Sequence, residues 1–151
     1  AAWPNKRWPP DRFGKVAAWL RRELGMSSIV TWGPGDEMIA AKVVDGSAGA
    51  AELAPTTSIA DLVAIAKEAA LMVSGDTGPI HLAAAVGTPV VGIYGPTHPD
   101  RNGPWSADDV TVSRFTACGC HHKRRCLVAR WCLEDVSVDD VTTAIARRLG
   151  V

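Results

Sequence analysis

Two short apolar runs in the middle of the chain constrain the fold more than any other feature. Residues 71–74 and 90–94 are apolar at almost every position and lack the polar alternation of a half-exposed strand. Runs of this kind are typical of strands whose two faces are both covered, as in a parallel sheet. Because parallel strands need long crossover connections, the sequence around them should form helices.

Helical patterns do fall between the predicted strands. Apolar residues recur at helical spacing over residues 13–24, with two prolines ahead of them and Gly25 behind. Further elements are predicted as helices over 36–44, 58–70, 78–86 and 137–149, strands over 28–32, 51–54 and 110–112, and a Pro, Gly and Asp-rich loop over 98–109. We therefore expect an α/β fold, a Rossmann-like parallel sheet with helices on both faces.

Length and charge narrow the class of protein. The chain has 151 residues, the size of one domain, and we expect a single domain over residues 1–151. It carries 16 Lys and Arg against 16 Asp and Glu, which excludes binding to nucleic acid by bulk charge alone. No apolar run approaches the roughly 18 residues needed to cross a bilayer.

The loop that follows the strand at residues 71–74 is the strongest candidate site. Parallel sheets bind ligands beyond the carboxyl ends of their strands, and here Ser74-Gly75-Asp76-Thr77-Gly78-Pro79-Ile80-His81 opens a helix. A helix start offers free N–H groups to a diphosphate, and Thr77, Gly78 and His81 suit the same ligand. The alternative is a capped helix, with Asp76 as its N-cap and His81 in the core.

Two other loops carry candidate residues, each with a plainer alternative. Glu37 or Asp36 could accept hydrogen bonds from a ribose, or both acids could simply favour a helix start. Gly95-Pro96-Thr97 follows the strand at 90–94, where it could shape the same pocket or only connect two elements.

A fourth candidate segment, Asn5-Lys6-Arg7-Trp8-Pro9, stands before the first helix. Lys6 and Arg7 could neutralise phosphate charge, or they could be a solvated pair of cations.

All four cysteines lie in one basic segment, residues 114–132. Cys118, Cys120, Cys126 and Cys132 could hold a structural zinc ion, or they could be free or redox-paired thiols. The nearby cations, Lys123, Arg124, Arg125 and Arg130, could face anionic lipid or a phosphorylated acceptor, or form a solvated loop.

Taken together, these segments resemble glycosyltransferase family 9, the lipopolysaccharide heptosyltransferases. The resemblance covers roughly residues 1–105. It is carried by Lys6-Arg7-Trp8-Pro9, by Trp32-Gly33 with Glu37, by the block from Ser74 through His81 to Ala85, and by Gly87-Thr88-Pro89 and Tyr94-Gly95-Pro96-Thr97.

The resemblance implies a GT-B enzyme with two Rossmann-like domains, of which this chain matches the C-terminal, donor-binding one. The first strand of that domain and the acceptor domain are expected to be missing, and with them the general base, so no catalytic residue is assigned here. Lys6 would contact the donor phosphates or the transferred sugar, and Glu37 would hold the ribose. Asp76, Thr77, Gly78 and His81 would hold the diphosphate and the neighbouring sugar.

The implied reaction is the inverting transfer of heptose from an ADP-heptose donor to the lipopolysaccharide inner core, with no required cofactor. The enzyme would be cytoplasmic, with peripheral contact to the inner membrane face. A GT-B transferase that uses another nucleotide-sugar stays open. A zinc-stabilised basic module that binds nucleic acid fits less well, because the net charge is zero and the sheet pattern would go unexplained.

Overall fold

The computed structural model describes residues 3–103 and 106–151; Ala1, Ala2, Pro104 and Trp105 lie outside the described residues. The chain divides into two compact units. One is formed by Pro9–Leu62, and the other by Ala1–Trp8 together with Val63–Val151. Each unit has its own parallel sheet.

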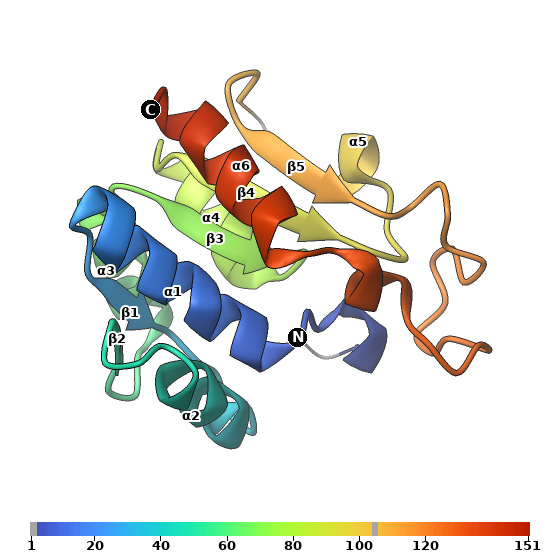
Figure 1. The fold of residues 1–151 in the computed structure, drawn as a ribbon, viewed down its shortest axis with the longest axis horizontal. Coiled ribbons are helices and arrows are strands. Elements are labelled where there is room, and N and C mark those ends of the chain that lie inside the picture. Colours follow the sequence, from blue (N-terminus) through green and yellow to red (C-terminus); the bar gives the residue numbers. More distant parts are fainter. Residues whose placement is uncertain (1–2, 104–105) are drawn as a thin grey trace. The chain divides into compact units, whose positions relative to one another are not determined.

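The unit formed by Pro9–Leu62 is a small α/β unit. It contains α1 (Pro10–Leu24), β1 (Ser28–Val30), α2 (Glu37–Asp45) and β2 (Ala51–Leu53) (Figure 1). β1 and β2 are parallel, with Ser28 opposite Ala51. α1 ends where Gly25 adopts a left-handed conformation with φ of 67°, which a residue with a Cβ rarely adopts.

The start of α3 (Ile59–Glu68) shows why the sequence forms a helix there. An Asp61 carboxylate oxygen accepts the Ser58 backbone N–H at 2.8 Å, and the Ser58 hydroxyl accepts the Asp61 N–H at 3.2 Å. This reciprocal pair satisfies two donors that a helix start otherwise leaves without partners.

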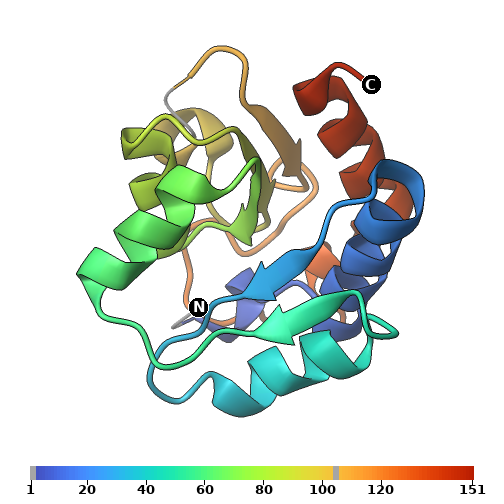
Figure 2. The same ribbon diagram turned by 90° about the vertical axis from the view of Figure 1, so that its left-hand side faces the viewer.

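The larger unit is built on a three-stranded parallel sheet. β3 (Met72–Gly75), β4 (Val90–Tyr94) and β5 (Val110–Ser113) lie in the order β3-β4-β5. α4 (Gly78–Ala85) lies on one face of this sheet and α6 (Val138–Leu149) covers the other (Figures 1 and 2). The predicted α/β class and parallel pairing are confirmed, but the strands form two sheets, one in each unit, where the sequence predicted one.

The core of this unit explains the unbroken apolar run in β4. Each β4 residue is buried, because α4 and α6 cover the two faces of the sheet. On the α4 side, Ile80 and Ala83 pack with Val90 and with Ala66 of α3.

At the start of α6, the Ser137 hydroxyl accepts the Asp140 N–H at 3.0 Å and an Asp140 carboxylate oxygen accepts the Ser137 N–H at 2.8 Å.

Three short helical turns were not predicted. They are η1 (Pro4–Lys6), α5 (Pro99–Asn102) and η2 (Cys132–Asp135). The segment 98–109 is therefore not all loop, because Pro99 starts a helical turn and His98 Nδ1 accepts the Asp100 N–H at 3.2 Å. The N-terminal turn is attached to this unit by the buried Trp8, whose indole N–H donates to the Val136 carbonyl at 3.0 Å.

Candidate functional site

The loop after β3 does not cap α4 with its aspartate. Thr77, in an extended conformation, is the N-cap residue of α4, and no side chain there accepts a capping hydrogen bond. Pro79 occupies the first turn, as predicted. The alternative in which Asp76 serves only as the helix cap is therefore wrong, and its carboxylate has other partners.

The first partner of Asp76 is Lys6, which comes from η1. The Lys6 ammonium nitrogen lies 2.6 Å from Asp76 Oδ2 and 3.4 Å from the Asp76 carbonyl oxygen. The same nitrogen sits 4.7 Å from the centre of the Trp3 ring, within cation–π distance. The Asp76 side chain is only 5% exposed, so the pair is held largely out of water.

His81 lies one helical turn into α4 and faces the same carboxylate. Its Nε2 is 3.4 Å from Asp76 Oδ1, and its side chain is 41% exposed. A histidine that is exposed to this extent is not a core residue, so that alternative for His81 is also wrong. Its ring can meet a ligand from solvent while it stays beside the Asp76–Lys6 pair.

Asn102 completes the group around Asp76, and sequence reasoning missed it. Its side-chain amide donates to Asp76 Oδ2 at 3.2 Å, and its backbone carbonyl accepts the Tyr94 hydroxyl at 3.0 Å. Asn102 belongs to α5, inside a segment predicted to be loop. The His98-Pro99 pair was the signal that could have indicated this turn, since proline favours the first helical position.

These contacts set the charge state of Asp76. Burial by itself raises the pKa of a carboxyl, but the hydrogen bond and charge of Lys6 oppose that effect, with smaller help from Thr97 and Asn102. The net result is a pKa for Asp76 below its ordinary value. The carboxylate is therefore ionised at neutral pH.

The predicted residues Thr77 and Gly78 lie at the edge of this group. The Thr77 hydroxyl lies 3.2 Å from the Ser74 hydroxyl and donates to the Gly75 carbonyl at 3.3 Å. A Cβ added to Gly78 would meet no atom of the protein within 4 Å. There is therefore open space at the helix start, and the protein's own packing does not require glycine at this position.

Gly95-Pro96-Thr97 follows β4 at the same edge of the sheet and anchors the cysteine segment. A Cβ at Gly95 would lie 2.8 Å from Leu133 Cγ and 3.0 Å from Cys132 Sγ, so glycine is required there for packing. The Pro96 carbonyl accepts the His122 N–H at 2.8 Å, and Thr97 is buried. The loop follows the strand next to β3, and Thr97 acts on the Asp76 carboxyl.

Glu37, the predicted ribose contact, belongs to the other unit. It is the first residue of α2 and its side chain is exposed, with Asp36 as the N-cap residue. The structure thus joins Lys6, Asp76 and His81 within one unit, and Glu37 stays a separate prediction.

The four cysteines are free thiols, two of them buried and two partly buried. The Cys120 N–H donates to Cys118 Sγ at 3.4 Å, and the Asn5 amide donates to Cys126 Sγ at 3.7 Å. The Leu127 N–H donates to Cys120 Sγ at 3.2 Å and lowers the pKa of that thiol, whereas burial raises the pKa of Cys132 to about 12. Across residues 3–103 and 106–151, no group of three or more His, Cys, Asp or Glu side chains is arranged to hold a metal ion. The zinc alternative and the thiol alternative for these four cysteines both stay predictions.

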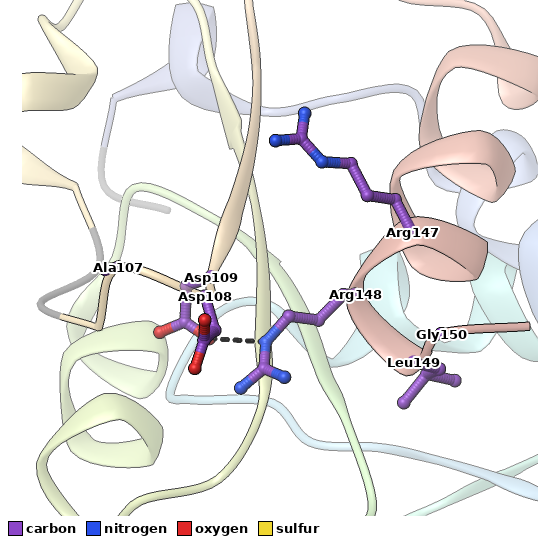
Figure 3. A pocket seen from close by; sticks show the side chains of 7 residues that line it. All are labelled: Ala107, Asp108, Asp109, Arg147, Arg148, Leu149 and Gly150. Carbon is purple, nitrogen blue, oxygen red and sulfur yellow. Dashed lines mark hydrogen bonds and ion pairs between the residues drawn. The ribbon is translucent and has the colours of Figure 1, made fainter.

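An open pocket of about 380 Å³ lies at the opposite edge of the three-stranded sheet. It is lined by residues 107–109 and 147–150, at the start of β5 and the end of α6 (Figure 3). The Asp109 carboxylate there accepts the Val90 N–H and the Arg148 Nε–H, both at 2.8 Å. Both of these hydrogen bonds hold the protein's own structure together. The pocket lies at the start of β5, whereas parallel sheets bind ligands at the carboxyl ends of their strands, so this pocket is not the candidate site.

Among the described residues, none of the helices combines the length and the apolar character that crossing a membrane requires.

Known proteins of similar sequence include two heptosyltransferases. The chain is 31% identical over 125 residues to lipopolysaccharide heptosyltransferase 1 of Pseudomonas aeruginosa, covering 82% of this chain and 35% of that protein. It is 32% identical over 128 residues to lipopolysaccharide heptosyltransferase 2 of Escherichia coli K12, covering 81% of this chain and 35% of that protein. The chain thus spans about a third of the length of these relatives.

Solved structures of similar fold cover nearly the whole chain. A glycosyltransferase family 9 structure from Veillonella parvula matches with a TM-score of 0.82 and 26% identity, over 99% of this chain and 43% of that one. E. coli heptosyltransferase WaaC with ADP matches with a TM-score of 0.78 and 24% identity, over 98% of this chain and 42% of that one. The second likeness shows the fold alone.

The family model that describes glycosyltransferase family 9 (heptosyltransferase) matches residues 1–132, most of the chain. The chain therefore belongs to glycosyltransferase family 9, the heptosyltransferase family.

Proposed function

We propose that the Lys6, Asp76 and His81 group binds the diphosphate of an ADP-sugar donor. The observation that carries this proposal is the meeting of a lysine, a histidine and a helix start around one buried carboxylate at the carboxyl ends of β3 and β4. Free N–H groups at the start of α4 and its dipole favour an anion at that end. Open sheets bind ligands at this edge.

Each residue has a definite role in this proposal. The Lys6 ammonium neutralises phosphate charge, and Asp76 holds Lys6 in place and accepts hydrogen bonds from the donor's sugar. The exposed His81 donates to a phosphate oxygen, and Thr77 adds a hydroxyl. The open space at Gly78 lets the diphosphate approach the backbone. Gly95-Pro96-Thr97 shapes the pocket, and Glu37 holds the ribose.

The proposed reaction is the inverting transfer of heptose to the lipopolysaccharide inner core by direct displacement. Support comes from the names of the curated relatives and from a solved relative bound to ADP-2-deoxy-2-fluoro heptose. In such a reaction, negative charge develops on the departing diphosphate. Lys6, His81 and the start of α4 would stabilise that charge from fixed positions, which is a large source of rate acceleration. The donor-binding role belongs to this chain, and the general base and the acceptor site are proposed to lie elsewhere in the enzyme.

Calorimetric titration of the purified chain with ADP and then UDP tests the proposal. We expect ADP to bind more tightly than UDP, and His81→Ala to weaken ADP binding by about tenfold, the loss of one charge-assisted hydrogen bond. His121→Ala is the matched control, because His121 is an exposed histidine that stacks on Phe115 and, in the part of the chain that the structure describes, makes no hydrogen bond or ion pair with Asp76. Equal affinity for the two nucleotides would count against the ADP donor. Equal effects of the two histidine variants would count against the site.

A second comparison separates the two acidic candidates. Asp76→Ala should weaken ADP binding more than Asp36→Ala does, because only Asp76 touches both Lys6 and His81.

Mixed with ADP-heptose and a lipopolysaccharide acceptor, the chain alone should show no transferase turnover, since it spans about a third of the length of its relatives. Turnover by the purified chain would show that the acceptor site also lies within it.

A further inference from the structure

The strongest charge asymmetry in the chain lies between Val110 and Leu133. This stretch holds five of the sixteen Lys and Arg residues and none of the sixteen Asp and Glu residues. Within it, residues 121–130, here called the basic loop, are all exposed except for the partly buried Cys126. A neutral protein thus concentrates positive charge on one exposed loop.

Three cations of the basic loop have no carboxylate partner. Arg130 pairs with Asp135 at 2.6 Å, and just outside the loop Arg114 pairs with Asp140 at 2.7 Å. In the part of the chain that the structure describes, no carboxylate pairs with Lys123, Arg124 or Arg125. Their charge is therefore available to an external anion.

Two exposed aliphatic residues follow these cations. Leu127 is 79% exposed and Val128 is 56% exposed, and they are adjacent in the sequence. The other large apolar residues that are exposed in the described chain are not adjacent to one another in the sequence. Exposure of an aliphatic pair to water is unfavourable. Beside three cations that have no carboxylate partner, the pair suits a boundary between charged headgroups and hydrocarbon.

The base of the basic loop is fixed to the body of its unit. The Asn5 amide donates to the Lys123 carbonyl at 2.8 Å, and the His122 N–H donates to the Pro96 carbonyl at 2.8 Å. The loop projects beyond the carboxyl ends of β4 and β5, where the orange trace extends furthest in Figure 1. Because Asn5 adjoins Lys6 and Pro96 adjoins Thr97, the loop is held beside the proposed donor site.

We propose that the basic loop docks this protein on the surface of an anionic lipid bilayer. Lys123, Arg124 and Arg125 meet the acidic headgroups, and Leu127 with Val128 enters the region between headgroups and acyl chains. Each Lys or Arg near an anionic surface strengthens binding about fivefold, and the aliphatic pair adds the burial of apolar area. Exposed aliphatic residues favour this partner over nucleic acid, whose bases would stack on exposed aromatic rings. This inference does not depend on the identity of the donor.

Vesicle co-sedimentation of the full chain tests this inference. The probes are vesicles of equimolar phosphatidylglycerol and phosphatidylcholine, and vesicles of phosphatidylcholine alone. We expect the chain to bind the anionic vesicles, to bind the neutral ones far more weakly, and to be released from the anionic vesicles as salt is raised. Absence of binding to anionic vesicles at low salt, or equal binding to both kinds, would overturn the proposal.

Matched variants assign the binding to the loop. Lys123→Glu combined with Arg125→Glu should weaken partition into anionic vesicles by at least about twentyfold. The control, Lys42→Glu with Lys67→Glu, makes the same charge change at two exposed lysines outside the basic loop. Leu127→Ser should weaken partition by roughly tenfold, whereas Ile59→Ser, at a residue that is 74% exposed, should not.

Equal losses in the test and control variants would mean that net charge or general hydrophobicity drives binding, and would overturn the loop's role. Thermal melts of each variant, compared with the parent, show that the variants fold. If Lys123→Glu with Arg125→Glu fails to fold, Leu127→Ser decides the question, because its exposed side chain packs against little.

Discussion

The Lys6 ammonium lies 2.6 Å from an Asp76 carboxylate oxygen, although 70 residues separate them in the sequence. The contact joins the N-terminal turn η1 to the loop after β3, and both side chains are mostly removed from water. It is therefore both a structural attachment of residues 3–8 and the centre of the proposed donor site. A change to either residue should affect stability as well as ligand binding.

Removal of the lysine charge should destabilise the fold. Lys6→Met leaves the buried Asp76 carboxylate without its cation, and we expect a loss of about 3 kcal/mol in the free energy of unfolding. Lys15→Met is the control. The Lys15 ion pair with Asp11, at 3.4 Å, is well exposed, so Lys15→Met should lower the free energy of unfolding by less than about 0.5 kcal/mol. Urea unfolding measures both, and a Lys6→Met midpoint equal to that of the parent would contradict the prediction.

The contribution of Asp76 to stability should fall away in acid. Its pKa in the folded protein is held below the ordinary value of 3.8, so the unfolded chain takes up the proton first as the pH falls. The stability that the carboxylate supplies is fully present above about pH 4 and is lost as the pH falls through its lowered pKa. We expect the parent to exceed Asp76→Asn in free energy of unfolding at pH 7, and the difference to shrink at pH 3. A difference that stayed constant or grew on acidification would contradict this sign.

Gly78→Ala should separate ligand binding from folding. A Cβ there meets no protein atom within 4 Å and lies at the start of α4, so stability should be unchanged or slightly higher. The same methyl group would occupy the space through which the diphosphate approaches the backbone, and we expect ADP affinity to fall at least about tenfold.

Gly119→Ala is the control for Gly78→Ala, because it too has open space around its Cβ. It lies outside the proposed site and should leave ADP affinity unchanged. Unaltered ADP binding by a folded Gly78→Ala protein would show that the ligand does not approach α4 at this residue.

Asp109 should matter for stability and not for ADP binding. Its carboxylate is 2% exposed and accepts the Val90 N–H at 2.8 Å. It also accepts the Arg148 Nε–H at 2.8 Å (Figure 3). Asp109→Ala leaves both donors without a partner, and we expect a cost of about 3 kcal/mol. ADP affinity of the folded variant, measured below its melting temperature, should match the parent. A marked loss of ADP affinity would mean that the nucleotide binds near Asp109, and that our proposal places it at the wrong edge of the sheet.

Local sequence signals predicted the elements they encode. The apolar spacing after Ser137 predicted α6, and the unbroken run at residues 90–94 predicted β4 at its observed bounds. Helix caps and covered strands depend on neighbouring residues and on average burial, which a single sequence shows. The turn α5 is four residues long, too short for any periodicity to reveal it, and Asn102 was missed with it.

The sequence by itself determined the α/β class, the parallel pairing and the loop in which a ligand site would form, because strand burial and the Asp76–His81 block are local patterns. Only the tertiary structure decided what Asp76 does. The sequence allowed a helix cap, yet the fold turns that carboxylate toward Lys6, His81 and Asn102. The physical reason is distance along the chain. Lys6 and Asn102 come from segments far from Asp76 in the sequence, and only the packing of η1 and α5 around β3 and β4 supplies the charges and donors that its carboxylate requires.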